Sequence, residues 1–184
     1  MLDLIIKNGS CYIDGNLKKQ DIGIKNNKIT EIGTINSDNS KEVFDASNLT
    51  VLPGCIDTQV HFREPGSAEA EDLNSGSRAA IVGGITSVFE MPNTNPPTSN
   101  KIEFSKKLKL AENRMYCNYA FYFGATSDNQ NELADLKNLT GCCGIKLFAG
   151  SSTGKLLVQH EEDIEKVFKN SSKIVSVHSE DEEI

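Results

Sequence analysis

The chain has 184 residues and a formal net charge of −7, and this acidic balance argues against a nucleic-acid or anionic-membrane partner. No apolar run approaches the roughly 20 residues of a transmembrane helix, and the N-terminus lacks the pattern of a signal peptide. Five cysteines without a CxxC spacing fit reduced thiols better than a disulfide framework, so we expect a cytoplasmic protein.

The first 52 residues predict a small β unit. Apolar or β-branched runs at 4–6, 21–25, 28–32 and 43–44 are typical of short strands. Asn8-Gly9, Asp14-Gly15 and Asn26-Asn27 separate them in the manner of hairpin turns. The polar run at 36–41 predicts a loop.

From Pro53 onward the pattern changes to strands that alternate with helices. Strands are expected at 54–60, 86–90, 116–123, 144–148 and 173–178, and helices at 73–82, 101–113, 129–139 and 161–170. This alternation predicts βα units around a parallel sheet. About five units are present, whereas a complete eight-stranded barrel needs roughly 250 residues. Residues 53–184 are therefore expected to be the first part of a longer α/β protein.

Polar residues gather where the predicted strands end, namely His61, Arg63, Asn93, Lys146 and His178. Sites of α/β barrels and open α/β sheets form at the carboxyl ends of strands. Residues two apart on a strand point to one side, so His61 and Arg63 would face a common site.

Each of these residues has a structural alternative. His61 and His178 are either metal ligands or structural histidines. Arg63 either binds a substrate carboxylate through paired hydrogen bonds or forms a salt bridge to Glu64 or Glu69.

Lys146 stands within an apolar run, where desolvation would favour a neutral, nucleophilic amine. Such an amine can take up carbon dioxide and bridge two metal ions as a carbamate. In the alternative, it reaches solvent or an acidic partner. Asn93 follows Pro92, which would fix the direction of its amide, although turn asparagines commonly cap backbone groups. The segment 150–155 lacks the GxxxxGK[ST] spacing of a phosphate loop.

Several motifs together resemble the dihydroorotases of the cyclic amidohydrolase superfamily. They are Pro53-Gly54-Cys55-Ile56-Asp57, Val60-His61-Phe62-Arg63-Glu64-Pro65-Gly66, Glu71-Asp72, Ser75-Gly76-Ser77-Arg78-Ala79-Ala80, Gly83-Gly84-Ile85-Thr86 and Met91-Pro92-Asn93-Thr94. The resemblance implies a partial (β/α)8 TIM barrel over 53–184, preceded over 1–52 by part of a β-sandwich domain. It also implies reversible cyclisation of N-carbamoyl-L-aspartate to L-dihydroorotate in pyrimidine biosynthesis, with zinc-activated water.

The resemblance assigns roles to the same five residues. It implies that His61 and His178 bind zinc, that Lys146 is the lysine carboxylated in some relatives, and that Arg63 and Asn93 grip the substrate carboxylate. A further histidine ligand and the catalytic aspartate would lie past residue 184. We therefore expect that these residues alone cannot complete an active site.

Two positions depart from the family pattern. Gln59 stands where the first metal-binding histidine is usual, which leaves open whether one or two Zn²⁺ ions bind. Ser151 and Ser152 stand where other dihydroorotases have a bridging aspartate. The alternatives are an allantoinase-like or hydantoinase-like enzyme, or a non-catalytic subunit that partners aspartate carbamoyltransferase. A homo-oligomer is also expected.

Overall fold

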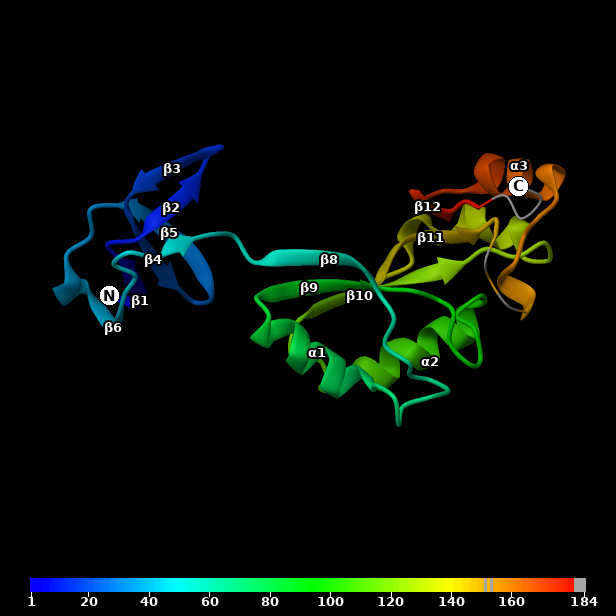
Figure 1. Cartoon of the computed structure of the whole chain (residues 1–184), viewed down its shortest axis with the longest axis horizontal. Coiled ribbons are helices and arrows are strands. Elements are labelled where there is room, and N and C mark those ends of the chain that lie inside the picture. Colours follow the sequence, from blue (N-terminus) through cyan, green and yellow to red (C-terminus); the bar gives the residue numbers. More distant parts are fainter. Residues whose placement is uncertain (151, 153, 181–184) are drawn as a thin grey trace. The chain divides into compact units, whose positions relative to one another are not determined.

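The computed structural model describes residues 1–150, 152 and 154–180, which divide into two compact units. The first unit comprises residues 1–53 and the second begins at Gly54, one residue beyond the boundary that the sequence pattern predicts. Figure 1 shows both units and labels most of their strands and the α-helices. In these described parts no helix is long and apolar enough to cross a membrane. All five cysteines are free thiols.

The N-terminal unit contains two small sheets. The four-stranded sheet has the order β5-β4-β1-β6, with β1 Leu2–Lys7, β4 Asp21–Lys25, β5 Lys28–Gly33 and β6 Ser40–Asp45. The three-stranded sheet has the order β3-β2-β7, with β2 Ser10–Ile13, β3 Asn16–Lys19 and β7 Thr50–Val51. A short 3₁₀ helix, η1, spans Ser37–Asn39. β2, β3 and β7 are additions to the predicted strands.

Two of the three predicted hairpin turns are confirmed. Asp14-Gly15 joins β2 to β3, and Asn26-Asn27 joins β4 to β5. All four turn residues have positive φ angles, between 50° and 79°, as type I′ turns require. The prediction for Asn8-Gly9 is wrong, because β1 and β2 belong to different sheets. The predicted loop at 36–41 contains η1 and the first residues of β6.

A buried carboxylate ties the N-terminal unit together. Asp21 accepts hydrogen bonds from the backbone N–H groups of Asn8, at 3.0 Å, and Ile35, at 3.1 Å. Burial alone would raise the pKa of Asp21, but these hydrogen bonds and the nearby Lys7 lower it overall. The carboxylate of Asp21 thereby fixes the chain just after β1, at Asn8, and just after β5, at Ile35.

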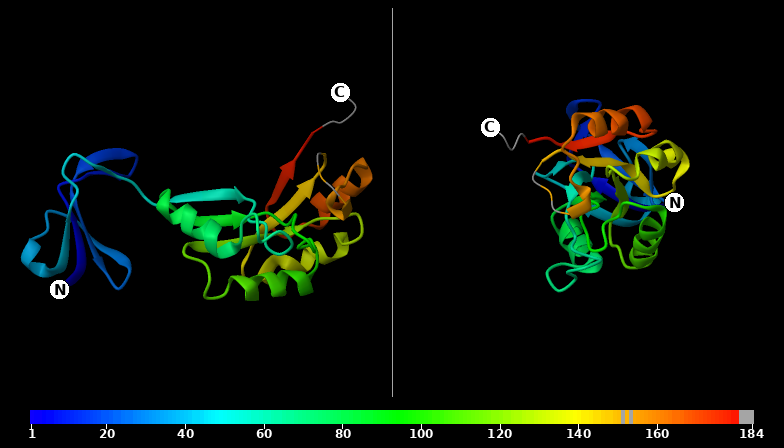
Figure 2. Two further views of the ribbon diagram at one scale, coloured as in Figure 1. Left: turned by 60° about the horizontal axis from the view of Figure 1, so that its bottom comes forward. Right: turned by 90° about the vertical axis from the view of Figure 1, so that its right-hand side faces the viewer.

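The second unit is a parallel sheet in the order β12-β11-β10-β9-β8. Its strands are β8 Cys55–Val60, β9 Ile85–Glu90, β10 Asn118–Gly124, β11 Cys142–Phe148 and β12 Val175–His178. The connections contain α1 Leu73–Val82, α2 Lys101–Ala111, η2 Gln130–Asn138, η3 Gly154–Leu156 and α3 Glu161–Asn170. The curled sheet with its helices, seen again in Figure 2, confirms the predicted part of a (β/α)8 barrel.

The main core lies between this sheet and its helices. It includes Val88 of β9, Phe104 of α2, Phe121 of β10, and Ile145 and Leu147 of β11. Aliphatic and aromatic residues at alternate positions of the strands therefore face the helices, and the residues between them face the opposite side of the sheet. This alternation decides which polar residues can share a site.

The ends of the helices follow from local sequence. Asp72 caps α1 by accepting a hydrogen bond from Ser75 N at 2.6 Å, and Ser75 Oγ accepts one from Asp72 N at 3.1 Å. Gly76 of α1 is required because a Cβ there would lie only 2.4 Å from the ring of Phe62. The first helix is thus held against the segment that follows β8.

The predicted helix at 129–139 is a 3₁₀ helix rather than an α-helix. Its buried residues are Gln130, Leu133 and Leu136, which are spaced by three. A 3₁₀ helix has three residues per turn, so this spacing places all three side chains on one line facing the core. The spacing of the buried residues therefore fits a 3₁₀ helix better than an α-helix.

Candidate active site

The predicted site residues lie at the carboxyl ends of the parallel strands. Val60 and Phe62 pack against the core beneath the helices, so His61 between them faces the opposite, inner side of the sheet. Ile145 and Leu147 are likewise in that core, which places Lys146 on the inner side as well. The two residues thus share the face of the sheet that the helices do not cover.

His61 is held by the side chain of Asn93. The distance from His61 Nδ1 to Asn93 Oδ1 is 2.9 Å. Because an amide oxygen only accepts hydrogen bonds, Nδ1 carries the proton and the lone pair lies on Nε2. The side-chain oxygen of Asn93 therefore binds His61 and does not cap the backbone of its own turn, as the alternative had it.

The surroundings of His61 favour the neutral imidazole. Burial lowers the pKa of His61, and the positive charges of Arg63, Lys146 and Lys107 lower it further, against the hydrogen bond to Asn93. A metal binds the neutral ring through its free nitrogen. The chemistry of His61 therefore fits a metal ligand that coordinates through Nε2.

The loops that follow β8 and β9 hold each other in place. Asn95 N donates to Pro65 O at 3.0 Å, and Met91 N donates to Val60 O at 3.0 Å. Gly66 has a φ of 121°, and a Cβ at this position would lie 2.7 Å from Asn95 Cβ. Only glycine allows this close approach without strain. The contact keeps Arg63 and Asn93 on neighbouring rigid segments.

The structure excludes one of the two alternatives for Arg63. Glu64 binds Arg114 through two hydrogen bonds, of 2.8 Å and 3.0 Å, and also accepts one from Leu73 N at 3.0 Å. The expected alternative of a salt bridge from Arg63 to Glu64 is therefore wrong. Within residues 1–150, 152 and 154–180 the exposed Arg63 side chain forms no salt bridge, to Glu69 or to any other residue.

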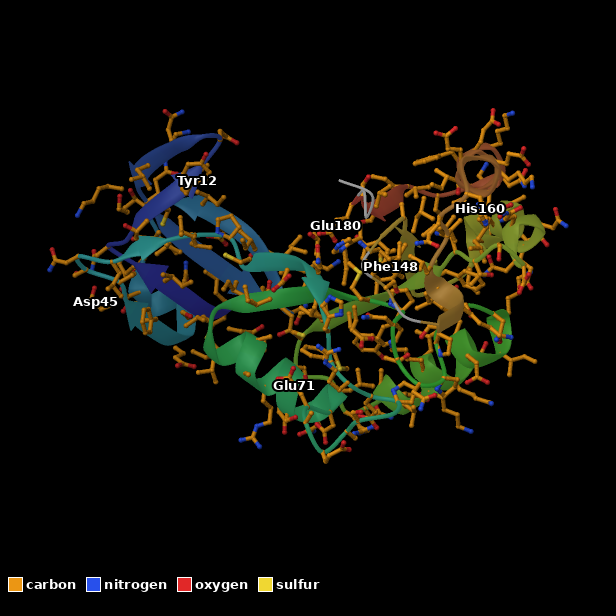
Figure 3. The ribbon with its side chains drawn as sticks, turned by 45° about the vertical axis from the view of Figure 1, so that its right-hand side comes forward. Tyr12, Asp45, Glu71, Phe148, His160 and Glu180 are labelled. Carbon is orange, nitrogen blue, oxygen red and sulfur yellow. The ribbon has the colours of Figure 1, made fainter. Side chains whose placement is uncertain are left out.

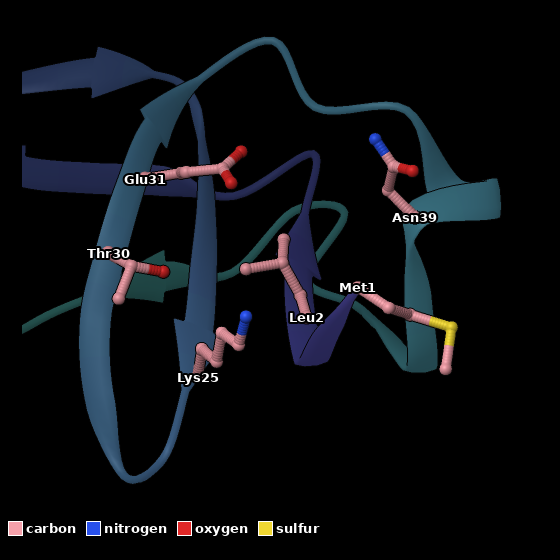
Figure 4. A pocket seen from close by; sticks show the side chains of 6 residues that line it. All are labelled: Met1, Leu2, Lys25, Thr30, Glu31 and Asn39. Atoms are coloured by element: carbon pink, nitrogen blue, oxygen red, sulfur yellow. The ribbon is translucent and has the colours of Figure 1, made fainter.

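Arg63 and Asn93 line one cavity of about 440 Å³. The other lining residues are Thr94, Asn95, Pro97, Gly154, Lys155 and Leu156. Sequence reasoning assigned no role to Lys155, although it lies in the segment 150–155 that superficially resembles a phosphate loop. Ser151 of that segment lies outside the described residues. A smaller cavity of about 200 Å³ in the N-terminal unit, shown in Figure 4, contains none of the predicted site residues.

Lys146 is buried without an acidic partner. The residue is only 2% exposed, and its Nζ lies 4.9 Å from the centre of the Phe148 ring. Burial lowers the pKa of Lys146, and no carboxylate of the described residues pairs with it. Among the described residues, Lys146 therefore has neither the solvent contact nor the acidic partner that the alternative requires. A desolvated amine of this kind is a suitable nucleophile for carbon dioxide.

His178 lies at the end of β12, beside the strand of Lys146. Its ring stacks on Phe148, labelled in Figure 3, with the ring centres 6.1 Å apart. Its Nε2 lies 3.5 Å from a carboxylate oxygen of Glu180. β12 and β8 are the two edge strands of the sheet, so the structure pairs His178 with the strand of Lys146 and not with that of His61.

The predicted metal ligands do not form a cluster by themselves. In the parts of the chain that the structure describes, no three His, Cys, Asp or Glu side chains lie close enough to hold one metal ion. Gln59 is exposed on β8, where the pairing with β9 shifts register between Asp57 and Val60. His61 and Lys146 share the inner side of the sheet, and His178 ends the strand beside that of Lys146.

A buried ion pair escaped the sequence-based predictions. Lys107 Nζ of α2 lies 2.5 Å from a carboxylate oxygen of Glu90 at the end of β9, and both side chains are fully buried. Burial raises the pKa of Glu90 to about 8 and lowers that of Lys107. The sequence did hold a signal for the burial of Lys107. This residue stands three positions after Phe104 and four before Ala111, and both of these are buried. That spacing places Lys107 on the core face of α2.

Comparison with known proteins identifies the family. The amidohydrolase family model matches residues 50–179. Dihydroorotase from Methanosarcina acetivorans is 37% identical over 187 residues, which cover 100% of this chain and 40% of that protein. Allantoinase from Desulfitobacterium hafniense strain Y51 is 37% identical over 148 residues, which cover 80% of this chain and 33% of that protein.

Solved structures agree with this match. L-Hydantoinase from Arthrobacter aurescens superimposes with a TM-score of 0.89 at 29% identity, over 100% of this chain and 42% of that one. The chain thus spans about two fifths of the length of the dihydroorotase and the hydantoinase that it matches. Sequence motifs, barrel topology and these matches agree: the chain belongs to the amidohydrolase family.

Proposed function

We propose that this chain is the first part of a dihydroorotase, which interconverts N-carbamoyl-L-aspartate and L-dihydroorotate. The observation that carries the proposal is the Arg63 side chain, which lines the same cavity as Asn93 and has no salt-bridge partner among the residues that the structure describes. Dihydroorotate carries a carboxylate, whereas the hydantoin and allantoin rings lack one at this position. A guanidinium without an internal partner is suited to bind that group through two hydrogen bonds.

The neighbours of Arg63 and Asn93 leave the right groups free for such a substrate. Arg114 occupies the carboxylate of Glu64, so Arg63 has no competing anion beside it in sequence. The hydrogen bond with His61 occupies Asn93 Oδ1, so the amide Nδ2 remains as a donor. Lys155, which lines the same cavity, adds a third cationic or hydrogen-donating group. Together these side chains favour an anionic substrate.

The proposed metal site involves His61, Lys146 and His178. A zinc ion held there would polarise the amide carbonyl of the ring and supply hydroxide at neutral pH. His61 would bind through Nε2, because Asn93 accepts the hydrogen on Nδ1. Carboxylated Lys146 would supply an anionic oxygen ligand. Since the amide of Gln59 is a poorer ligand than imidazole, we propose one firmly held zinc ion, and metal analysis that found two would contradict this.

The proposed specificity is tested with Arg63→Met in the complete enzyme. Loss of a charge-assisted hydrogen bond costs about 1.5–3 kcal/mol, so kcat/KM for dihydroorotate should fall by roughly 10- to 150-fold. Turnover of hydantoin or allantoin, if present, should change little. Arg78→Met is the matched control. Arg78 belongs to α1, lies over the ring of Tyr116 and does not line this cavity.

Two results would overturn the proposal. Preferred turnover of hydantoin or allantoin over dihydroorotate would favour the rival enzyme classes, in line with the allantoinase and hydantoinase matches. No turnover of any of the three by the metal-loaded protein would favour the non-catalytic subunit that Gln59 suggests. Activity that disappears in His178→Ala would exclude that second alternative.

A further inference from the structure

The buried Glu90–Lys107 pair has a position that the proposed chemistry does not explain. Both side chains lie in the layer between the sheet and α2, and the Lys107 ammonium also lies 5.1 Å from the centre of the Phe121 ring. Burying two charges costs several kcal/mol per ion before their attraction is counted. The pair therefore calls for a role beyond stability.

Lys107 makes one further contact, and it leads to the candidate active site. Its Nζ donates a hydrogen bond to the backbone oxygen of Met91 at 3.2 Å, and Met91 is 1% exposed. The N–H of Met91 is already bound to Val60 O of β8. Lys107 and Val60 thus hold both polar groups of one residue, at the point where β9 gives way to the loop.

The loop beyond Met91 transmits this constraint to Asn93. Pro92 has a fixed φ, and its ring restricts the conformation of Met91 as well. Asn93 follows at once, and its Oδ1 lies 2.9 Å from His61 Nδ1. A change in the orientation of the Met91 carbonyl would move the Asn93 amide, because few backbone torsions separate the two groups.

We propose that Lys107 is a positioning residue: by binding the Met91 carbonyl, it holds the turn that presents Asn93 to His61. Asn93 in turn keeps the proton of His61 on Nδ1 and leaves Nε2 free. The helix layer thereby determines which nitrogen of His61 faces the inner side of the barrel. Glu90 has a different part, since it offsets the charge of Lys107 and does not itself contact the loop carbonyl.

Nitrogen-15 NMR of labelled histidine in this chain tests the proposal without any need for activity. The ratio of the Nδ1–H to the Nε2–H form of His61 is measured at a pH where the ring is neutral. The chain has only three histidines, so His160 and His178 serve as internal references. Asn93→Ala gives the ratio in the absence of the acceptor.

Two variants separate positioning from stability. Glu90→Gln keeps the Lys107 nitrogen as donor to Met91, so the ratio should stay at its original value. The double variant Glu90→Gln/Lys107→Met removes the donor but leaves no buried charge, and such neutral replacements of buried pairs usually fold. The ratio should then fall about tenfold, the equivalent of one lost hydrogen bond of roughly 1.4 kcal/mol.

The outcomes decide the matter in either direction. A fall confined to the double variant and Asn93→Ala supports positioning by Lys107. Equal ratios in Glu90→Gln and in the double variant would overturn it, as would a ratio that follows stability across the variants. Lys106→Met is the matched control, because Lys106 is the exposed neighbour on α2 and forms a salt bridge with Glu103 of the same helix. It should leave the ratio unchanged.

Discussion

The two sides of the parallel sheet each bury a lysine, and they treat it in opposite ways. On the helix side, Lys107 is fully buried but has Glu90 at 2.5 Å and the Met91 carbonyl at 3.2 Å. On the inner side, Lys146 is 2% exposed, and its Nζ lies 4.9 Å from the centre of the Phe148 ring. The Lys107 amine is bonded to protein groups, whereas the Lys146 amine has no hydrogen-bond or salt-bridge partner among the described residues.

This difference separates a structural lysine from a chemical one. Burial lowers the pKa of both residues, but Glu90 opposes the effect at Lys107, whereas desolvation alone acts at Lys146. A buried polar group without a partner costs free energy that folding must offset. Such a residue is retained where its reactivity is useful, and perturbed groups of this kind cluster at functional sites.

The largest expected effect comes from Lys107→Met. Removing the ammonium leaves Glu90 buried without a partner, so the free energy of unfolding should fall by about 3–5 kcal/mol. Urea denaturation measures this, with Lys106→Met on the same helix as the control that should change it by less than about 0.5 kcal/mol. Adding Glu90→Gln should recover much of the loss. A loss below about 1 kcal/mol would show that the buried Glu90 does not depend on Lys107 as its partner.

Lys146→Met should change the free energy of unfolding in the opposite direction. The substitution replaces an amine without a partner by an apolar side chain of similar length, so the free energy of unfolding should rise by about 1–3 kcal/mol. The same urea titration measures it, in buffer free of bicarbonate. Destabilisation comparable to that of Lys107→Met would contradict the difference between the two lysines, because it would show that Lys146 also has a partner.

The smallest effect is a dependence on pH. The unfolded chain keeps the Lys146 proton up to its ordinary pKa of 10.5, whereas the folded chain releases it at lower pH. Between the two pKa values the unfolded state binds more protons, so the stability contributed by this site rises with pH, by at most about 1.4 kcal/mol per unit. The advantage of Lys146→Met over the original protein should therefore shrink as the pH approaches 10.5. An advantage independent of pH would show that Lys146 does not titrate in this window.

Uptake of carbon dioxide would sharpen the contrast further. With ¹³C-labelled bicarbonate, a carbamate carbon signal should appear in the original protein and be absent in Lys146→Met. Of the two buried lysines in the part of the chain that the structure describes, Lys107 has protein partners and Lys146 has none. Lys107→Met should retain the signal if it folds. A signal that survives Lys146→Met would place the reactive amine elsewhere.

Local patterns predicted much of the second unit. The helices at 73–82 and 161–170 match α1 and α3. The capping box of Asp72 and Ser75 marks the start of α1, whereas the side chain of His160 does not cap α3. The strand positions agree within a few residues, since apolar runs mark parallel strands. The predicted helix at 129–139 is instead a 3₁₀ helix, whose buried residues recur every three positions rather than at the α-helical spacing.

The contacts that shape the candidate site could not be predicted in the same way. Glu64 and Arg114 are 50 residues apart, and Lys107 and Met91 are 16 apart. No local period encodes such pairings, which exist only once the sheet and helices have packed. The positions of His61, Arg63 and Asn93 after strands were visible in the sequence. Their mutual geometry required the fold.

The anchoring of the loop after β8 has a consequence for how substrate preference can change. Arg114 and Leu73 hold Glu64, and the close approach of Gly66 to Asn95 fixes the chain on the other side. The Arg63 side chain lies between these anchors and contributes to neither. Position 63 can therefore vary without rebuilding the backbone. Under the proposed function, we expect one substitution at this position to shift the preference of the same scaffold from carboxylate-bearing rings to neutral ones.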